Sequence, residues 1–427
     1  MRPATYERYG EYRDDVAPWL GNVPTDWTFE KGKWHHQYVK TLNSKRECEN
    51  VLSLTLRGVV NNDPNNPEGL VPSDYGTYQL FDKDDLVFKL IDLENVRTSR
   101  VGLVHEHGIM SSAYIRIKPS LQTNARFLYY YYYNLYLGEV FNKLGSGVRS
   151  TLNHNDLLAL PVPIIPFATQ GAIASFLDKK LDQISQAIAI KEQQIALLKE
   201  RKQIIIQEAV TKGLDPNAPM KGSGVDWIGK IPAHWEVRRS KYLFTQRKEF
   251  ARKGDVQLSA TQSYGVIPQD EFEELVGRRV VKIQTNLEKR KHVELDDFVI
   301  SMRSFQGGLE RAFASGCIRS SYVILRPLET VNPDYFGYLF KSPRYIKALQ
   351  ATGSFIRDGQ DLNFDNFSKV DLFIPPLDEQ AAIGAHIKFA CQKIDNGIAT
   401  KQQQIATLNE YKTCLINGAV TGKIKVA

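Results

Sequence analysis

The chain has 427 residues and a formal net charge of +7 at pH 7, a length that exceeds one hydrophobic core and predicts two or three domains. Its apolar fraction of 42% excludes a disordered chain, its longest apolar runs fall short of the roughly 20 residues of a membrane span, and its first residues lack the apolar core of a secretory signal. Its four cysteines show no CxxC spacing, so we expect reduced thiols, no zinc site and a cytoplasmic location.

The first recognisable element is residues 19–27, with the sequence WLGNVPTDW. It returns at residues 227–235 as WIGKIPAHW, so that Trp, Gly, Pro and Trp keep their spacing. A Gly–Pro turn flanked by two tryptophans predicts a turn fixed to a core by buried aromatic rings. We favour this structural role over a ligand site.

Strand-like, turn-rich sequence follows each of these elements for about 130 residues. Leu86–Phe88 matches Phe298–Ile300, each after Asp-Asp, and a helical segment at 126–144 matches one at 334–349. The similarity fades at 39–81 and at 257–293. Two modules that share one architecture but differ in specificity would show this pattern of similar flanks around a divergent internal part.

A Gly-Ser-x-x-Arg loop closes each module. Its hydroxyl and guanidinium are candidate contacts to a phosphate or a base edge, although a plain turn explains the loop nearly as well. The candidate DNA-binding residues are Ser146, Arg149, Arg303, Ser354 and Arg357. Other basic residues either contact phosphates or belong to a solvated face, among them Arg57, Arg100, Arg116, Arg126, Arg247, Arg290 and Arg311.

A long helix follows each module, and the two helices are copies of one sequence. Residues 163–211 align with 373–421 without a gap, and about 20 positions are identical, far more than chance allows. Apolar residues recur in steps of three and four, the seam of helices that pair lengthwise; ordinary helices buried in a bundle are the alternative. The structural and partner-helix candidates are Gln170, Ile184, Ile188, Ile195 and Leu198 in the first copy and Gln380, Ile394, Ile398, Ile405 and Leu408 in the second.

The order of these parts predicts an antiparallel helix pair. A helix of about 45 residues is roughly 65 Å long, whereas a compact module is roughly 40 Å across. The second module joins the end of the first helix to the start of the second, which requires these two points to be close. The predicted parts are an arm at 1–16, a module at 17–165, a helix at 166–213, a linker at 214–226, a module at 227–374, and a helix with its tail at 375–427.

Catalytic and metal motifs are absent from the sequence. It has no Walker loop, no nucleotide fingerprint and no GxSxG. The His105/His107 and His35/His36 pairs have no third ligand at a recognisable spacing. We therefore expect no catalytic residue, no metal and no cofactor on this chain.

Two modules that open with W-[LI]-G-x-[VI]-P-x-x-W, each followed by a P-x-x-x-Q-x-x-I helix ending in A-V-T, resemble the specificity (S) subunit of type I restriction–modification systems. The resemblance covers nearly the whole chain. Residues 375–380 match the family's Pro-Pro-x-x-Glu-Gln entry to the helix, whereas residues 166–170 lack the Glu. The implied fold is α/β (α+β), with two similar globular target recognition domains, a pair of long antiparallel coiled-coil helices and internal pseudo-two-fold symmetry.

The resemblance also implies a function. Each domain would read one half of a bipartite, asymmetric site in double-stranded DNA, and the helices would set the unread spacer and dock two methyltransferase (M) subunits. Those partners and the restriction (R) subunits would use S-adenosylmethionine, ATP and Mg²⁺ for adenine methylation and cleavage. Two alternatives stay open: the recognition part of a single-chain methylating nuclease, and a coiled-coil scaffold with no role on DNA.

Overall fold

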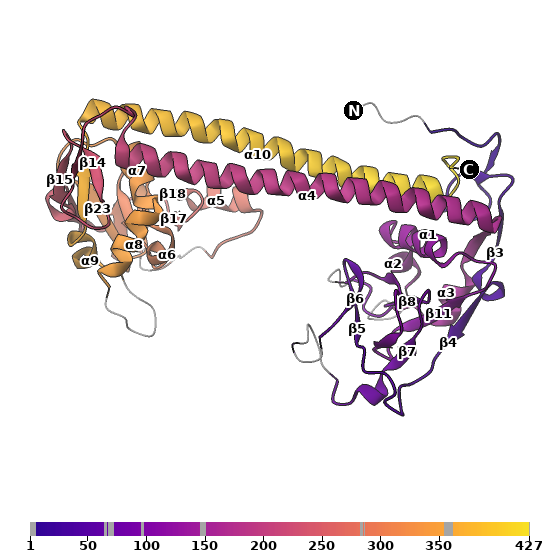
Figure 1. The fold of residues 1–427 in the computed structure, drawn as a ribbon. Coiled ribbons are helices and arrows are strands. Elements are labelled where there is room, and N and C mark those ends of the chain that lie inside the picture. The colour runs from indigo at the N-terminus through magenta and orange to yellow at the C-terminus, as the bar shows by residue number, and fades with distance from the viewer. Residues whose placement is uncertain are drawn as a thin grey trace. The chain divides into compact units, whose positions relative to one another are not determined.

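The chain folds into two units of matching design. The computed structural model describes residues 6–63, 66, 72–94, 98–145, 151–281, 285, 287–353 and 362–426. Unit 1 comprises Met1–Lys191 and Gln402–Ala427, and unit 2 comprises Glu192–Lys401. Each unit therefore contains one module and half of each long helix (Figure 1).

Unit 1 is built on a four-stranded antiparallel sheet of order β4-β11-β8-β9. Four two-stranded ladders surround it, β1-β2, β3-β12, β5-β6 and β7-β10. The strands are β1 (Tyr12–Arg13), β2 (Val23–Pro24), β3 (Thr28–Lys31), β4 (His36–Val39), β5 (Leu52–Thr55), β6 (Gly58–Asn61), β7 (Gln79–Phe81), β8 (Leu86–Phe88), β9 (Val101–Leu103), β10 (Gly108–Met110), β11 (Ile115–Pro119) and β12 (Pro161–Ile164).

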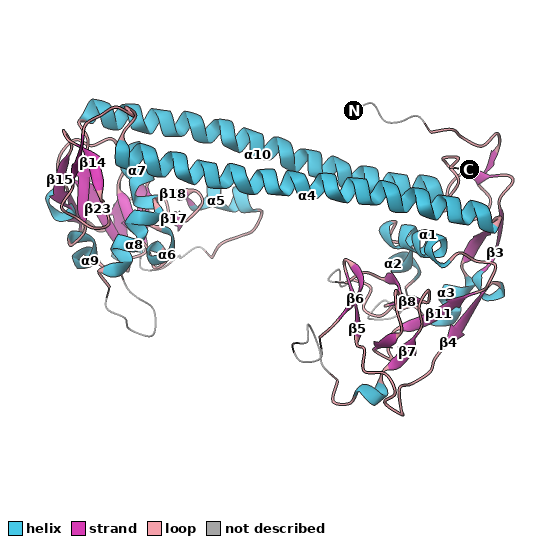
Figure 2. Ribbon diagram, viewed as in Figure 1, coloured by secondary structure: helices cyan, strands magenta, loops and turns pink. Residues whose placement is uncertain are grey.

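Unit 2 repeats every one of these pairings in the same order along the chain. Its four-stranded sheet has the order β16-β23-β20-β21, and its ladders are β13-β14, β15-β24, β17-β18 and β19-β22 (Figure 2). The strands are β13 (Met220–Gly222), β14 (Lys230–Pro232), β15 (Glu236–Arg239), β16 (Phe244–Arg247), β17 (Leu258–Thr261), β18 (Gly265–Pro268), β19 (Lys291–Val293), β20 (Phe298–Ile300), β21 (Glu310–Arg311), β22 (Gly316–Ile318), β23 (Val323–Pro327) and β24 (Asp371–Ile374).

Short helices cover the sheets, and helix is present where it was expected, although with a break that was not expected. The helical segments predicted at 126–144 and 334–349 are each two helices, because Glu139 takes a left-handed backbone in the first and Ser342 an extended one in the second. Asn124 caps α1 in unit 1, and Asn332 caps the corresponding helix α7 in unit 2 in the same way. The helices are α1 (Ala125–Leu137), α2 (Val140–Leu144) and α3 (His154–Ala159) in unit 1, and α5 (Gln269–Val276), α6 (Ser304–Gly307), α7 (Pro333–Lys341), α8 (Pro343–Ala351) and α9 (Phe364–Ser368) in unit 2.

The long helices are α4 (Phe167–Lys212) and α10 (Leu377–Val420), and they run antiparallel within each unit. In unit 2, Leu198 lies against Gly397, and Lys202 forms an ion pair with Asp395 at 2.7 Å. In unit 1, Lys191 Nζ donates to Gln404 Oε1 at 2.7 Å. The predicted antiparallel pair is confirmed.

The predicted seam residues differ in burial. Ile184, Ile394 and Ile398 are buried, whereas the remaining apolar seam residues are half-buried. Two helices without further neighbours cover only part of each side chain, so partial exposure is the expected result for a two-stranded coiled coil. The half-buried seam residues are Ile188, Ile195, Leu198, Ile405 and Leu408.

The end of each long helix closes on a tryptophan turn. Trp27 and Trp235 are buried, which confirms their predicted structural role. Gly422, at φ +71°, leaves no room for a side chain because a Cβ would lie 2.5 Å from Pro24. Gly213, at φ +74°, lies in the same way against Trp235. Each helix C-terminus is thereby fixed to a module core.

A buried guanidinium joins the sheet to two acidic residues in each unit. Arg116 Nε donates to Asp85 Oδ2 at 2.6 Å, and its Nη2 donates to Asp82. Arg247 Nε donates to Asp297 Oδ2 at 2.7 Å, and its Nη2 contacts Glu294 at 3.0 Å.

The two arginines come from different strands. Arg116 pairs across the sheet with Val39, and Arg247 pairs with Ile324. The arginine has therefore moved to the neighbouring strand, while the ion pair keeps its place.

His36 lies where unit 2 has a phenylalanine. It pairs with Pro119, as Phe244 pairs with Pro327. Both ring nitrogens of His36 are buried and have no partner among the described residues. Burial lowers the pKa of His36 to about 4, so the imidazole is neutral in the folded chain at neutral pH.

His36→Phe should therefore stabilise unit 1. At pH 7 the gain is about 1–2 kcal/mol, because two unsatisfied buried polar atoms are removed. The gain should be about 2 kcal/mol larger at pH 5. The pKa of His36 is lower in the folded chain than in the unfolded chain, so the wild type loses stability as the pH falls below the pKa of the unfolded chain, and the Phe variant does not. Urea denaturation at both pH values tests this, with exposed His386→Gln as the control. A variant that tracks wild type at both pH values contradicts the prediction.

Candidate nucleic-acid interface

Two β-hairpins carry the sequence that differs most between the modules. In the β5–β6 hairpin, Thr55 Oγ1 donates to Gly58 O at 3.0 Å and accepts from Arg57 N at 3.1 Å. In the β17–β18 hairpin, Thr261 Oγ1 donates to Gly265 O at 3.1 Å and accepts from Tyr264 N at 3.0 Å. The same threonine bracing therefore holds two different tips.

The tips differ in length and chemistry. The first tip is Leu56–Arg57, and the second is Gln262, Ser263 and Tyr264. Leu56 and Tyr264 are 60% and 40% exposed. A brace that both units share, under tips that differ between them, is what a recognition element requires, since the brace fixes the geometry and the tip sets the preference.

An exposed patch surrounds the second tip. Gln262 Nε2 donates to Arg303 O at 3.3 Å, and Phe313 N donates to Val266 O at 2.9 Å. Met302 and Phe313 are more than half exposed. Among the described residues Arg303 has no acidic partner, so its charge is available for a phosphate or a guanine edge. We call Gln262, Tyr264, Met302, Arg303 and Phe313 the second-tip patch.

The first tip borders a groove of about 600 Å³ within unit 1. Its walls are Leu56 and Arg57 of the tip, tyrosines of α1, and Lys412 of α10. Arg126, also in the wall, forms an ion pair with Asp178 at 2.8 Å. Within the described ranges Arg57 and Lys412 form no ion pair. Cationic groups beside aromatic rings are typical of nucleic-acid grooves.

Several basic residues that the sequence offered for phosphate contact are used inside the protein. Arg116 and Arg247 are buried in the ion pairs described above. Burial raises the pKa of Asp85 and of Asp297, although the guanidiniums oppose it. The other internal guanidiniums are Arg100, which donates to Asp92 O, Arg290, which is buried, and Arg311, which pairs with Asp296 and Asp334.

The predicted site residues fall into two groups. Ser146, Arg149, Ser354 and Arg357 lie outside the described residues, so they stay predictions, while Arg303 lies in the second-tip patch. The hairpin tips were missed by sequence reasoning. The divergence at 39–81 and 257–293 together with the retained Thr55 and Thr261 was the available signal.

The glutamines predicted at the helix starts hold each helix to its module. Gln170 Oε1 accepts from Asn124 N at 2.8 Å, and its Nε2 donates to Ile165 O at 2.8 Å. Gln380 makes the matching bonds to Asn332 N and Pro375 O, both at 2.9 Å.

The neighbouring Glu379 also has an intramolecular role. Its Oε2 accepts from Trp235 Nε1 at 3.0 Å and bonds His234 Nε2 at 2.7 Å. The family's Glu-Gln entry thus explains how the second long helix is held to its own module.

One group of described residues has metal-ligand chemistry. The ligand atoms of Glu249, His292 and Glu294 lie within 4.8 Å of one another. The guanidiniums of Arg247 and Arg252 already bind both carboxylates, and Asp255 bonds His292 Nδ1 at 2.8 Å. The cluster is an ion-pair network, and we assign no metal to it.

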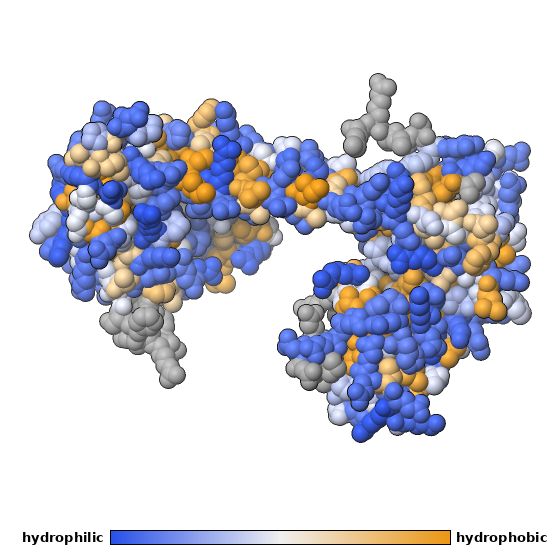
Figure 3. Space-filling view, in the orientation of Figure 1, coloured by the Kyte–Doolittle hydropathy of each residue, from blue (hydrophilic) through white to orange (hydrophobic). Residues whose placement is uncertain are grey.

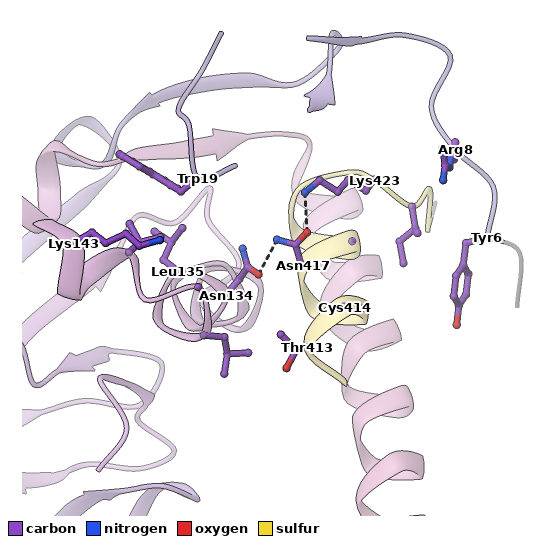
Figure 4. A pocket seen from close by; sticks show the side chains of 15 residues that line it. Tyr6, Arg8, Trp19, Asn134, Leu135, Lys143, Thr413, Cys414, Asn417 and Lys423 are labelled. Carbon is purple, nitrogen blue, oxygen red and sulfur yellow. Dashed lines mark hydrogen bonds between the residues drawn. The ribbon is translucent and has the colours of Figure 1, made fainter. Parts of the chain in front are cut away.

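A cavity of about 670 Å³ lies near the end of α10 in unit 1 (Figure 4). Asn417 Nδ2 donates to Asn134 Oδ1 at 3.1 Å, and Lys423 Nζ donates to Asn417 Oδ1 at 2.9 Å. These bonds join α10 to α1 and to the tail, so the polar groups serve the joint and we assign the cavity no ligand.

Comparisons with known proteins agree with this architecture. A family model for the type I restriction modification DNA specificity domain matches residues 57–200. A chain solved in a study of complex assembly and conformational transition of the type I R-M system has a TM-score of 0.67 and 13% identity, covering 94% of this chain and 99% of that one. The HsdS subunit from Thermoanaerobacter tengcongensis has a TM-score of 0.52 and 14% identity, covering 94% and 98%. No curated protein matches the sequence.

The fold and the family model define the class. Residues 57–200 match the type I restriction modification DNA specificity domain, and the chain as a whole shares its fold with the HsdS subunit and with the chain from the type I R-M complex. The predicted resemblance and fold class are confirmed. None of the described helices has a stretch long and apolar enough for a bilayer.

Proposed function

We propose that this chain is the sequence-reading subunit of a type I restriction–modification complex. Each unit reads one half of a bipartite, asymmetric site in double-stranded DNA, and the paired helices set the unread spacer. The observation that carries this proposal is the pair of hairpins: one frame, one threonine brace and two different tips. The family match over residues 57–200 supports DNA as the ligand.

The chemistry is proposed to belong to partner subunits. This chain binds no cofactor, while two M subunits use S-adenosylmethionine to methylate adenine, and R subunits use ATP and Mg²⁺. A stripe on α4 supports partner docking on the helices: Ile190, Leu197 and Ile204 follow a repeat of seven and are at least half exposed. Figure 3 shows apolar patches on the exposed face of the helix pair, and such patches mark interaction surfaces.

Co-expression with the cognate M subunit, followed by genome-wide mapping of methyladenine, tests the function. We expect methylation at a split site with two specified halves and an unspecified spacer. The chain purified alone should neither methylate nor cleave DNA. Methylation at one continuous site, or activity in the isolated chain, contradicts the proposal and favours a single-chain enzyme.

The two tips should act on separate halves of that site. Arg57→Ala should weaken recognition of one half-site and Arg303→Ala that of the other, each by about 10-fold, because a cation in contact with a phosphate or a guanine contributes about 1–3 kcal/mol. Competition binding with half-site variants at several salt concentrations measures both effects. Lys347→Met, an exposed lysine on α8, is the control. Equal losses on both halves in either variant contradict the assignment.

A further inference from the structure

The side chain of Gln262, at the second tip, is held at both ends. Its Oε1 accepts from Lys341 Nζ at 3.4 Å, and its Nε2 donates to Arg303 O at 3.3 Å. It also lies directly over Gly307, where a Cβ would be 1.5 Å from Gln262 Oε1. The amide therefore fastens the tip to the loop that carries Met302 and Arg303.

Lys341 is itself held by a buried carboxylate. Its Nζ donates to Glu310 Oε1 at 2.6 Å. Glu310 is fully buried, and its second oxygen has no partner among the described residues. A buried carboxylate with one cationic partner keeps that partner in place, because separating them leaves an uncompensated charge in the interior. A continuous chain of contacts thus runs from Glu310 through Lys341 to the hairpin tip.

The described residues of unit 1 contain no such chain of contacts. Gly102 pairs with Val87 as Glu310 pairs with Val299, so Gly102 is the counterpart of Glu310. Tyr133 has the place in α1 that Lys341 has in α7, counted from the N-caps.

Apolar packing holds the first tip instead. A Cβ on Gly102 would lie 2.6 Å from Leu54 and 2.7 Å from Val59, so the β5–β6 hairpin packs directly on the sheet. The second hairpin also packs on its sheet, through buried Leu258 and Val266, but its tip has the polar bracket in addition, which the first tip lacks.

We propose that Lys341, held by Glu310, is a positioning residue that sets the base preference of unit 2 alone. It fixes the amide of Gln262 and, through it, the placement of Tyr264 and Arg303. It makes no DNA contact itself. This inference rests on the proposed function and names the part of unit 2 that determines its specificity.

The test uses the full chain in complex with its M subunit, and two variants that disturb Gln262 by different routes. Lys341→Met removes the charge and keeps the length of the side chain. Gly307→Ala removes no charge but displaces Gln262 sterically. Lys347→Met and Gly222→Ala are the matched controls, since Lys347 is exposed and a Cβ on Gly222 would meet no atom within 4 Å.

The readout is discrimination between the cognate second half-site and its single-base variants, measured by competition binding and by methyladenine mapping. We expect both variants to lose about 10-fold in discrimination at the second half-site, with the first half-site unchanged. Lys341→Arg, which keeps the charge, should retain most of the preference. An unchanged first half-site also shows that the complex has assembled, and Gly307→Ala keeps the test open if Lys341→Met fails to fold.

The outcomes distinguish the positioning role of Lys341 from the proposed function. Unaltered discrimination in both variants overturns the positioning role while the proposed function stands. Equal loss on both half-sites also overturns it, because a specific bracket in unit 2 cannot act on unit 1. A wild-type complex that recognises no split site overturns the proposed function and this inference together.

Discussion

Arg116→Ile should lower the free energy of unfolding of unit 1 by about 3–5 kcal/mol, because it leaves Asp85 buried without its cation. Asp85 is buried and accepts from Arg116 Nε at 2.6 Å. Urea denaturation measures the loss. Arg126→Ile is the control: Arg126 is half exposed and its pair with Asp178 should contribute less than about 1 kcal/mol.

The second unit supplies the rescue. There the arginine comes from the neighbouring strand, with Ile324 facing Arg247. Unit 1 with Arg116→Ile and Val39→Arg would have the same arrangement, and the double variant should recover most of the loss. A double variant no more stable than Arg116→Ile would show that the two ion pairs are not interchangeable.

Glu310 should make unit 2 less stable as the pH rises. Burial raises the pKa of Glu310 from 4.5 to about 7, so the folded chain holds a proton that the unfolded chain releases. Stability is then lost between these two pH values, by about 3 kcal/mol in total. Glu310→Gln cannot ionise and should lack this loss.

Urea unfolding of the wild type and of Glu310→Gln is monitored by tryptophan fluorescence at pH 5 and pH 8, and the midpoints are compared. Exposed Glu288→Gln serves as the control. The wild type should fall relative to Glu310→Gln as the pH rises. Parallel curves would show that Glu310 is ionised at both pH values, and that Lys341 offsets its burial fully.

The sequence predicted the features that depend on a local residue pattern and occur in both halves of the chain. The antiparallel helices follow from a repeat of seven and from chain order, and the buried Trp27 and Trp235 follow from a repeated turn. The breaks at Glu139 and Ser342 were missed, because apolar spacing alone does not show where one helix ends and the next begins.

Pairings across the sheet could not be predicted from the sequence. Arg116 and Arg247 occur in the sequence as basic residues like any other, and only the register of strands far apart in the chain shows that both are internal cations. The same holds for the tip residues, since the contact of Gln262 with Lys341 joins segments that no local pattern connects.

The division of the chain into units has a consequence for biosynthesis. Unit 2 is one contiguous segment, whereas unit 1 needs residues from both ends of the chain: Lys425 N donates to Glu7 O at 2.7 Å, and Tyr12 hydroxyl donates to Gly422 O at 3.1 Å. A chain emerging from the ribosome can thus complete unit 2 before unit 1, although unit 1 is started first. Until residues 402–426 have emerged, the nascent first module lacks the second half of α10, and ribosome-bound chains that expose residues only up to about 401 should be the species most prone to association through that uncovered core.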